Sequence, residues 1–124
     1  MSEQVKIIIG DIELDAQLNG SFTANKVLQA LPIQTTVNKW GDEIYFDILL
    51  NLPAENEKEL VSAGDIAYWP QGPCLCIFFG PTPMSLTPEE IRPAGPVNVI
   101  GKIPSGWEKL KKIKQSETII IKKI

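Results

Sequence analysis

The chain of 124 residues contains no histidine, a single arginine (Arg92) and two cysteines (Cys74 and Cys76). Without histidine it cannot assemble a Ser-His-Asp or Cys-His nucleophile system or a histidine-ligated metal site. Two cysteines alone do not complete a tetrahedral zinc site, and their i,i+2 spacing is poorly suited to an unstrained disulfide. We therefore interpret both cysteines as small buried side chains, and we expect no metal and no other cofactor.

The sequence also lacks a long hydrophobic run. Its longest apolar stretch is far short of the roughly 20 residues that a membrane-spanning helix needs. Residues 1–6 carry neither an apolar signal region nor an arginine-rich presequence. The composition is 44% hydrophobic and 22% charged, which is typical of an ordinary soluble domain. We expect a single domain over residues 1–124, located in the cytoplasm and without a membrane partner.

Positive charge is scarce in the first half of the chain. Residues 1–64 hold four lysines against ten acidic residues, whereas residues 65–124 hold seven lysines and Arg92 against five. A basic face near the C-terminus can contact nucleic acid. The net charge of −3 instead favours a solvated helix face and a charged strand. We expect no nucleic-acid partner. The basic excess lies at Lys109, Lys111, Lys112, Lys114, Lys122 and Lys123.

The hydrophobic pattern predicts mainly β structure. Apolar and polar residues alternate most clearly over residues 12–18, after a Gly-Asp hairpin signal. One helix is predicted to start at Ser21 and end at Pro32, and a second to start at a capping box over residues 105–108. Eight strands and two helices predict a closed β-barrel whose ends the helices cover. The strands are predicted over residues 5–9, 12–18, 33–39, 43–49, 65–69, 74–80, 97–103 and 118–124.

Several motifs in this layout resemble a known family. The segments Gly-Asp-Ile-Ala-Tyr-Trp-Pro (64–70) and Cys-Ile-Phe-Phe-Gly-Pro-Thr-Pro (76–83) are similar to segments of the small prokaryotic cyclophilin-like proteins. Residues 36–46 and 97–103 match the same family in the same order. The resemblance runs from about residue 5 to the C-terminus. It implies a cyclophilin-type barrel and no established activity.

The similarity to true cyclophilins is fainter. The Phe-Phe pair at residues 78–79 resembles the end of a cyclophilin strand, which implies that Phe79 lies where those enzymes place a phenylalanine in the floor of the proline pocket. The Phe-His-Arg motif of cyclophilins, whose arginine polarises the substrate amide, has no match near residues 40–46. The cyclophilin pocket histidine falls near Val97 or Asn98. Because neither catalytic residue is matched, efficient peptidyl-prolyl isomerase activity is not expected.

Aromatic residues beside turns are the candidates for a binding site. Trp and Tyr near prolines are typical of sites for small molecules and for extended or proline-containing peptides. Tyr45 lies within a predicted strand, which favours a core role, whereas Trp40 and Trp69 adjoin turns and fit core and pocket equally well. The candidate pocket residues are Trp40, Tyr45, Trp69, Pro70, Phe79 and Thr82.

The stretch over residues 68–83 is expected to contribute to both core and pocket. Leu75, Ile77 and Phe78 are expected to fill the barrel. The connection over residues 81–96 contains five prolines, and a connection this long in a compact domain is usually functional or well anchored.

The interpretation that the residues favour is an uncharacterised cyclophilin-like protein that binds a small molecule or a proline-containing peptide in an aromatic pocket. A weak or divergent isomerase is the first alternative. The second is a non-catalytic homo-oligomeric scaffold, in which the apolar strand at residues 118–121 pairs with another copy if it lies at an exposed edge. A hydrolase that uses Asp42 and Glu43 is not supported, because adjacent carboxylates on a turn are more often solvated.

Overall fold

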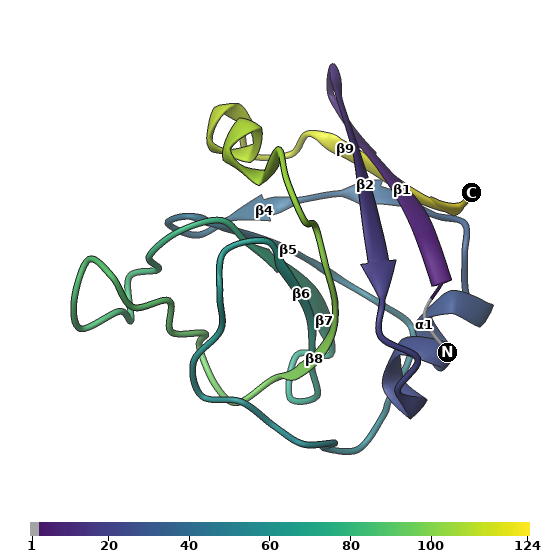
Figure 1. The fold of residues 1–124 in the computed structure, drawn as a ribbon, viewed down its shortest axis with the longest axis horizontal. Helices are drawn as coiled ribbons and strands as arrows, with labels where there is room; N and C mark the ends of the chain where they lie inside the picture. The colour runs from purple at the N-terminus through teal and green to yellow at the C-terminus, as the bar shows by residue number, and fades with distance from the viewer. Residues whose placement is uncertain (1–2) are drawn as a thin grey trace.

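The computed structural model describes residues 3–124, which form nine strands arranged as a nearly closed barrel (Figure 1). Neighbouring strands are antiparallel, in the order β3-β9-β1-β2-β8-β6-β7-β5-β4. The predicted fold class, a mainly β barrel, is confirmed. The strands are β1 (Glu3–Ile9), β2 (Ile12–Leu18), β3 (Ile33–Thr36), β4 (Asn38–Lys39), β5 (Glu43–Asp47), β6 (Asp65–Trp69), β7 (Cys74–Phe78), β8 (Asn98–Lys102) and β9 (Thr118–Lys123).

The predicted count of eight strands is too low by one, because residues 33–39 divide at Val37. β3 pairs with β9, whereas β4 pairs with β5. Val37 donates its N–H to Glu117 O and accepts from Ser116 N, both at 2.9 Å, so the chain is held firmly where it passes from one strand partner to the other. The two ends of the strand order are therefore consecutive in the chain, and the sheet comes nearly round on itself.

Two helical segments pack against the barrel. α1 (Phe22–Gln29) is the predicted first helix, and the Ser21 hydroxyl caps it by accepting from Ala24 N at 3.2 Å. The second segment, η1 (Trp107–Lys112), is a 3₁₀-helix that begins after Gly106 at φ 86°. No side chain of the described residues caps it, and its N-cap is Gly106, so the predicted capping box at Ser105 is wrong. Within residues 3–124, no helix combines the length and apolarity that a bilayer span requires.

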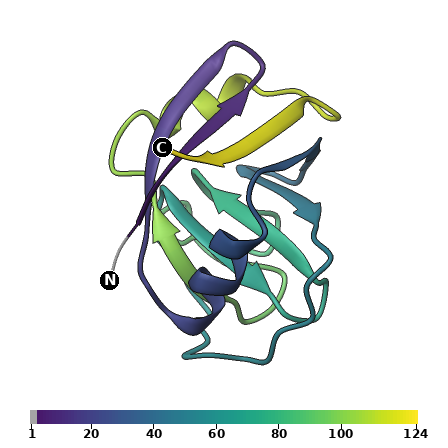
Figure 2. The same ribbon diagram turned by 90° about the vertical axis from the view of Figure 1, so that its right-hand side faces the viewer.

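The helical segments lie on opposite sides of the barrel, and α1 crosses in front of the strands in Figure 2. Both supply apolar side chains to the same core inside the barrel. Leu110 of η1 is fully buried, and Val27 of α1 is 2% exposed. The expected covering of the barrel by two helices is thus observed, with the second helix tighter than an α-helix.

Alternation along β5, β6 and β7 divides their side chains between two apolar clusters, because successive residues of a strand point to opposite faces. Phe78 has the same parity as Cys74 and Cys76 and therefore packs on the outer face, not inside the barrel as predicted. The barrel cluster includes Ile44, Phe46, Ile66, Tyr68, Leu75, Ile77 and Phe79. The outer cluster consists of Ala67, Cys74, Cys76, Phe78, Ile91 and Val97.

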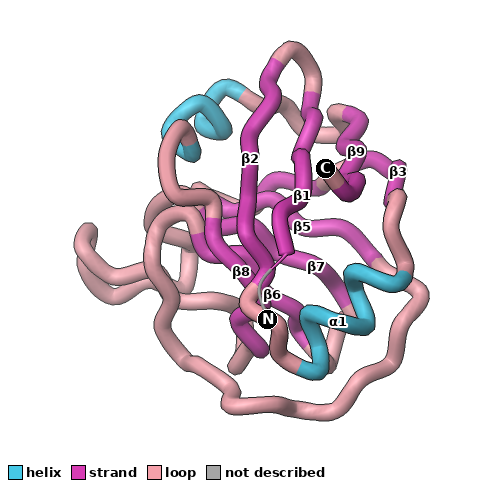
Figure 3. Tube along the Cα trace, turned by 45° about the vertical axis from the view of Figure 1, so that its right-hand side comes forward, coloured by secondary structure: helices cyan, strands magenta, loops and turns pink. Residues whose placement is uncertain are grey.

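Two long connections, between β5 and β6 and between β7 and β8, cover the outer cluster and appear as large loops in Figure 3. In the second, Thr82 Oγ1 donates to Arg92 O, and Ser85 Oγ accepts from Thr82 N at 3.0 Å and from Arg92 N at 3.2 Å. The proline-rich connection is therefore well anchored, by bonds that tie its start to its end. Isolated bridges join the two connections at Lys58–Val97 and Val61–Ile91.

β9 has a strand partner on each side, β3 and β1. The apolar strand that the scaffold alternative needs as a free edge is therefore interior to the sheet. An exposed edge strand can recruit another copy through its unpaired backbone groups, whereas a strand bonded on both sides cannot.

Candidate ligand-binding pocket

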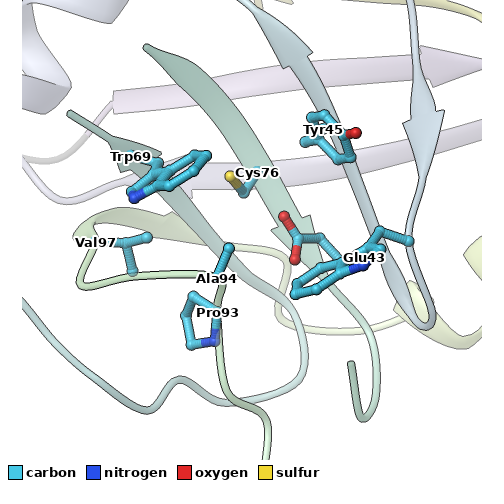
Figure 4. A pocket seen from close by; sticks show the side chains of 8 residues that line it. Glu43, Tyr45, Trp69, Cys76, Pro93, Ala94 and Val97 are labelled. Carbon is cyan, nitrogen blue, oxygen red and sulfur yellow. The ribbon is translucent and has the colours of Figure 1, made fainter. Parts of the chain in front are cut away.

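Three residues of the predicted site, Trp40, Tyr45 and Trp69, line one cavity of about 150 Å³. The cavity lies on the outer face of β5, β6 and β7, beneath the connection that leads to β8. Its remaining lining residues are Glu43, Cys76, Pro93, Ala94 and Val97 (Figure 4).

Strand register explains why the sheet surface is hollow at this point. Tyr45 lies opposite Cys76, and Cys76 lies opposite Ala67 on the next strand. Two small side chains thus follow Tyr45 across the sheet, and Trp69 lies two residues beyond Ala67 on the same strand, opposite Cys74. In Figure 4 the Cys76 sulfur lies between the Trp69 ring on one side and Tyr45 and Glu43 on the other.

A tight turn brings Trp40 and Glu43 to the pocket together. Trp40 N donates to Glu43 O at 2.9 Å, and Glu43 N donates to Trp40 O at 3.2 Å, so that two residues separate the paired positions. Gly41 in this turn has φ 60°, and a Cβ there would lie 2.8 Å from Pro83 Cδ. Only glycine therefore fits without strain, and the turn holds both side chains on a rigid hairpin.

Glu43 is the unexpected member of the site. Its side chain is predicted to be solvated, but the residue is only 4% exposed, and its Oε1 has no hydrogen-bond partner among the residues that the structure describes. Within residues 3–124 it forms no ion pair. Burial raises the pKa of Glu43 to about 7, and a hydrogen bond from the Cys76 thiol offsets only part of this effect. The pocket thus contains a carboxyl group that changes charge near neutral pH.

The two cysteines are free and buried, as predicted. Burial, followed by the hydrogen bond and negative charge of Asp47, raises the pKa of Cys74 to about 12. The Cys74 thiol donates to Asp47 Oδ1 at 3.4 Å. Burial and the neighbouring Glu43 raise the pKa of Cys76 well above its usual range. Both thiols are therefore neutral and unreactive at physiological pH.

Trp69 forms the wall opposite Glu43. Its Nε1 is buried and has no hydrogen-bond partner in the described part of the chain, and a Cβ on Gly95 would lie 2.9 Å from that nitrogen. In Figure 4 the nitrogen is at the end of the indole that points away from Cys76, so the six-membered ring faces the cavity. The connection after β7 thus packs against the Nε1 edge of the indole, and the apolar six-membered ring lines the pocket.

The other three predicted residues lie outside the cavity. Phe79 is 1% exposed and packs inside the barrel, because it has the parity of Leu75 and Ile77. Thr82 is buried and holds the connection to Arg92 O. Pro70 lies in the turn after β6 and is partly buried. Five lining residues were not predicted from the sequence: Glu43, Cys76, Pro93, Ala94 and Val97.

Comparison with known proteins gives the same family as the motifs. The Cyclophilin-like family model matches residues 3–122. Among solved structures, a hypothetical protein from Archaeoglobus fulgidus, determined in solution, is 36% identical and superposes with a TM-score of 0.82. That match covers 99% of this chain and 95% of the archaeal chain. No curated protein matches at a significant level. The resemblance inferred from residues 64–70 and 76–83 is confirmed: the chain belongs to the cyclophilin-like family.

Proposed function

We propose that this protein binds a small organic molecule, or one group of a larger ligand such as a peptide, in the cavity between Trp40, Tyr45 and Trp69. The observation that carries the proposal is the convergence of three aromatic side chains, two from the β4–β5 hairpin and one from β6, around a buried carboxyl group whose Oε1 has no hydrogen-bond partner among the described residues. Apolar walls with a few polar groups are the usual composition of small-ligand sites.

The size of the cavity limits the occupant. A volume of about 150 Å³ is below the roughly 300 Å³ at which drug-sized ligands are accommodated. An engineered cavity of about 150 Å³ in another protein binds benzene, which has six heavy atoms. We therefore expect a compact ligand of this size, or a single ring or head group inserted from a longer molecule.

Fluorine NMR of the protein labelled with 5-fluorotryptophan tests the proposal directly, because the chain has three tryptophans. Trp40 and Trp69 line the cavity, whereas Trp107 packs against the barrel core. A binding fragment is expected to shift the resonances of Trp40 and Trp69 and to leave that of Trp107 unchanged. A library of compounds with about five to eight heavy atoms suits the cavity.

Two variants that each replace an alanine with tryptophan supply the test and its control. Ala94 is an exposed residue that lines the cavity, and Ala54 is an exposed residue of a different loop. Ala94→Trp is expected to abolish the shifts by filling the mouth of the cavity, whereas Ala54→Trp is expected to preserve them. If no compound shifts Trp40 or Trp69, or if Ala94→Trp binds as well as the original protein, the proposed function is wrong.

A further inference from the structure

Glu43 lacks the partner that a buried carboxyl group requires. It is 4% exposed, and its Oε1 is buried without a hydrogen bond from any residue of 3–124. A buried charge is stable only when a partner of opposite charge or several hydrogen bonds replace the lost water. The site as it stands supplies one thiol hydrogen bond, from Cys76.

Two cationic residues directly precede lining residues of the pocket in the sequence, and each already has hydrogen-bond partners outside it. Lys39 Nζ, one residue before Trp40, donates to Lys111 O at 3.0 Å and to Ile113 O at 2.9 Å. Arg92, one residue before Pro93, donates to the two oxygens of Glu90 at 2.9 and 3.2 Å. Among residues 3–124 no cation forms an ion pair with Glu43, so a positive charge that pairs with it has to come from outside these residues.

The walls around Glu43 favour a particular kind of cation. The faces of Trp and Tyr rings attract ammonium groups, most strongly where water is excluded, and aromatic cages of this kind recognise quaternary ammonium ligands. An ammonium that carries methyl groups has no strongly held water shell and presents an apolar surface to the rings. Trimethylammonium and tetramethylammonium heads have four or five heavy atoms, and they suit a cavity of about 150 Å³.

We infer that the pocket binds a small methylated ammonium cation, with the Glu43 carboxylate as its counter-ion and Trp40, Tyr45 and Trp69 as its cage. This inference rests on the proposed function and names the ligand class for the same cavity. A neutral ligand of the same shape gains the apolar contacts but not the attraction to Glu43 and the ring faces.

The affinity is expected to depend on pH through Glu43. The ionisable groups that face it are the Cys76 and Cys74 thiols of β7 and the Tyr45 phenol of β5, and the lining residues of the connection, Pro93 and Ala94, are not ionisable. Both thiols are neutral because their pKa values are raised. Glu43 therefore changes charge in the site near neutral pH, and only its ionised form attracts the cation.

Choline and 3,3-dimethylbutan-1-ol form a matched pair of probes, because the alcohol replaces the cationic nitrogen with carbon and keeps the shape. Titrations at constant ionic strength, followed by the fluorotryptophan signals, give both affinities. At about pH 8.5 we expect choline to bind roughly tenfold or more tightly than the alcohol. The preference is expected to fall as the pH decreases through 7 to about 5.5.

Variants locate the effect at Glu43. Glu43→Gln is expected to weaken choline binding by about tenfold or more without weakening the alcohol, whereas Glu43→Asp keeps a preference for choline. Asp47→Asn is the control, since Asp47 is an exposed residue on the same face of β5 and its replacement removes the same charge. We expect it to change choline binding by less than about twofold.

The outcomes separate this inference from the proposed function. Equal binding of the two probes, or binding of other library compounds but of neither probe, overturns the cation inference and leaves the ligand-binding proposal standing. The absence of any shift at Trp40 and Trp69 with every compound overturns both. If Glu43→Gln does not fold, the pH dependence in the original protein and the Glu43→Asp variant still decide.

Discussion

Asn98 Nδ2 donates a hydrogen bond to Thr23 Oγ1 at 3.1 Å, and this contact joins β8 to α1 across 75 residues of sequence. Both residues are buried, at 1% and 0% exposure. Asn98 also accepts from Glu55 N at 2.8 Å and donates to Pro53 O at 3.0 Å. One amide side chain thus fixes the helix and the connection after β5 to the barrel.

Replacement of this amide is expected to be costly. Asn98→Ala leaves Glu55 N and Pro53 O without partners, and a buried group that loses its hydrogen bond costs about 1–3 kcal/mol. We expect the free energy of unfolding, measured by urea denaturation, to fall by about 2–4 kcal/mol. Asn25→Ala is the control, because its one side-chain bond within the described part of the chain is an exposed contact to Gly20 O at 3.3 Å. A loss below about 1 kcal/mol for Asn98→Ala contradicts the role assigned to it.

Glu43 is expected to make the protein less stable as the pH rises from 4.5 to 7. Below 4.5 the carboxyl is protonated in both the folded and the unfolded chain. Between pH 4.5 and about 7, Glu43 ionises in the unfolded chain but stays protonated in the folded chain. The unfolded state is therefore stabilised relative to the folded state. The shift from 4.5 to about 7 corresponds to a loss of about 3 kcal/mol, complete above pH 7.

Urea denaturation at a series of pH values measures this effect as the difference between the original protein and Glu43→Gln. Over this pH range the free energy of unfolding of Glu43→Gln is expected to rise by about 3 kcal/mol relative to that of the original protein. Asp47→Asn, which removes an exposed charge, controls for general electrostatic effects. A difference that is constant across the range means that the Glu43 carboxyl is solvated.

Thiol labelling tests the burial of the cysteines independently. With the pKa of Cys74 at about 12, its thiolate is about a thousandfold rarer at pH 8 than that of a cysteine with the ordinary value of 9.0. We expect iodoacetamide to modify the folded protein about a hundredfold or more slowly than the urea-unfolded protein, with Cys76 the slower of the two residues. The variants Cys74→Ala and Cys76→Ala assign the two rates. Comparable rates in the folded and unfolded protein would contradict the placement of these thiols.

A chymotrypsin-coupled assay on X-Pro peptides is expected to show no acceleration. Rotation about the peptide bond has a barrier of about 18–20 kcal/mol, which an isomerase lowers by donating a hydrogen bond to the amide nitrogen of the twisted bond. The cavity contains no cationic donor, and Arg92 is paired with Glu90. Phe79, the residue that matches the cyclophilin pocket, lies inside the barrel. Acceleration that Glu43→Gln abolishes would show instead that the protonated carboxyl acts as the donor.

Local patterns were sufficient to predict most strands and α1. β2 alternates clearly, and Ser21 is followed by an apolar stripe, so both elements are specified by short-range chemistry. The division at Val37 was not predictable, since residues 33–39 contain no glycine or proline to mark it. The 3₁₀ geometry of η1 was not predicted either; the segment begins after Gly106, where a Cβ would lie 2.9 Å from Leu14 Cδ2.

The lining of the pocket was likewise predictable only in part from local patterns. Strand parity places Glu43 and Tyr45 on one face of β5, and it excludes Phe79 from that face of β7. This face is covered by residues 58–63 and 81–97, which pack on it through contacts distant in sequence. No local pattern encodes such contacts, so an acidic residue on an outward face was interpreted as solvated.

The division at Val37 has a mechanical consequence. Eight ladders connect the nine strands of residues 3–124 in a row, and a single residue joins the two outermost strands of that row. The start of β1 and the end of β9 also meet, since Ile124 N donates to Gln4 O at 3.4 Å. A circular permutant that links Ile124 to β1 and opens the backbone at residue 37 therefore keeps every ladder and removes only the covalent connection between β3 and β4. The decrease in its free energy of unfolding measures how much the stability of the barrel depends on the single covalent connection at Val37.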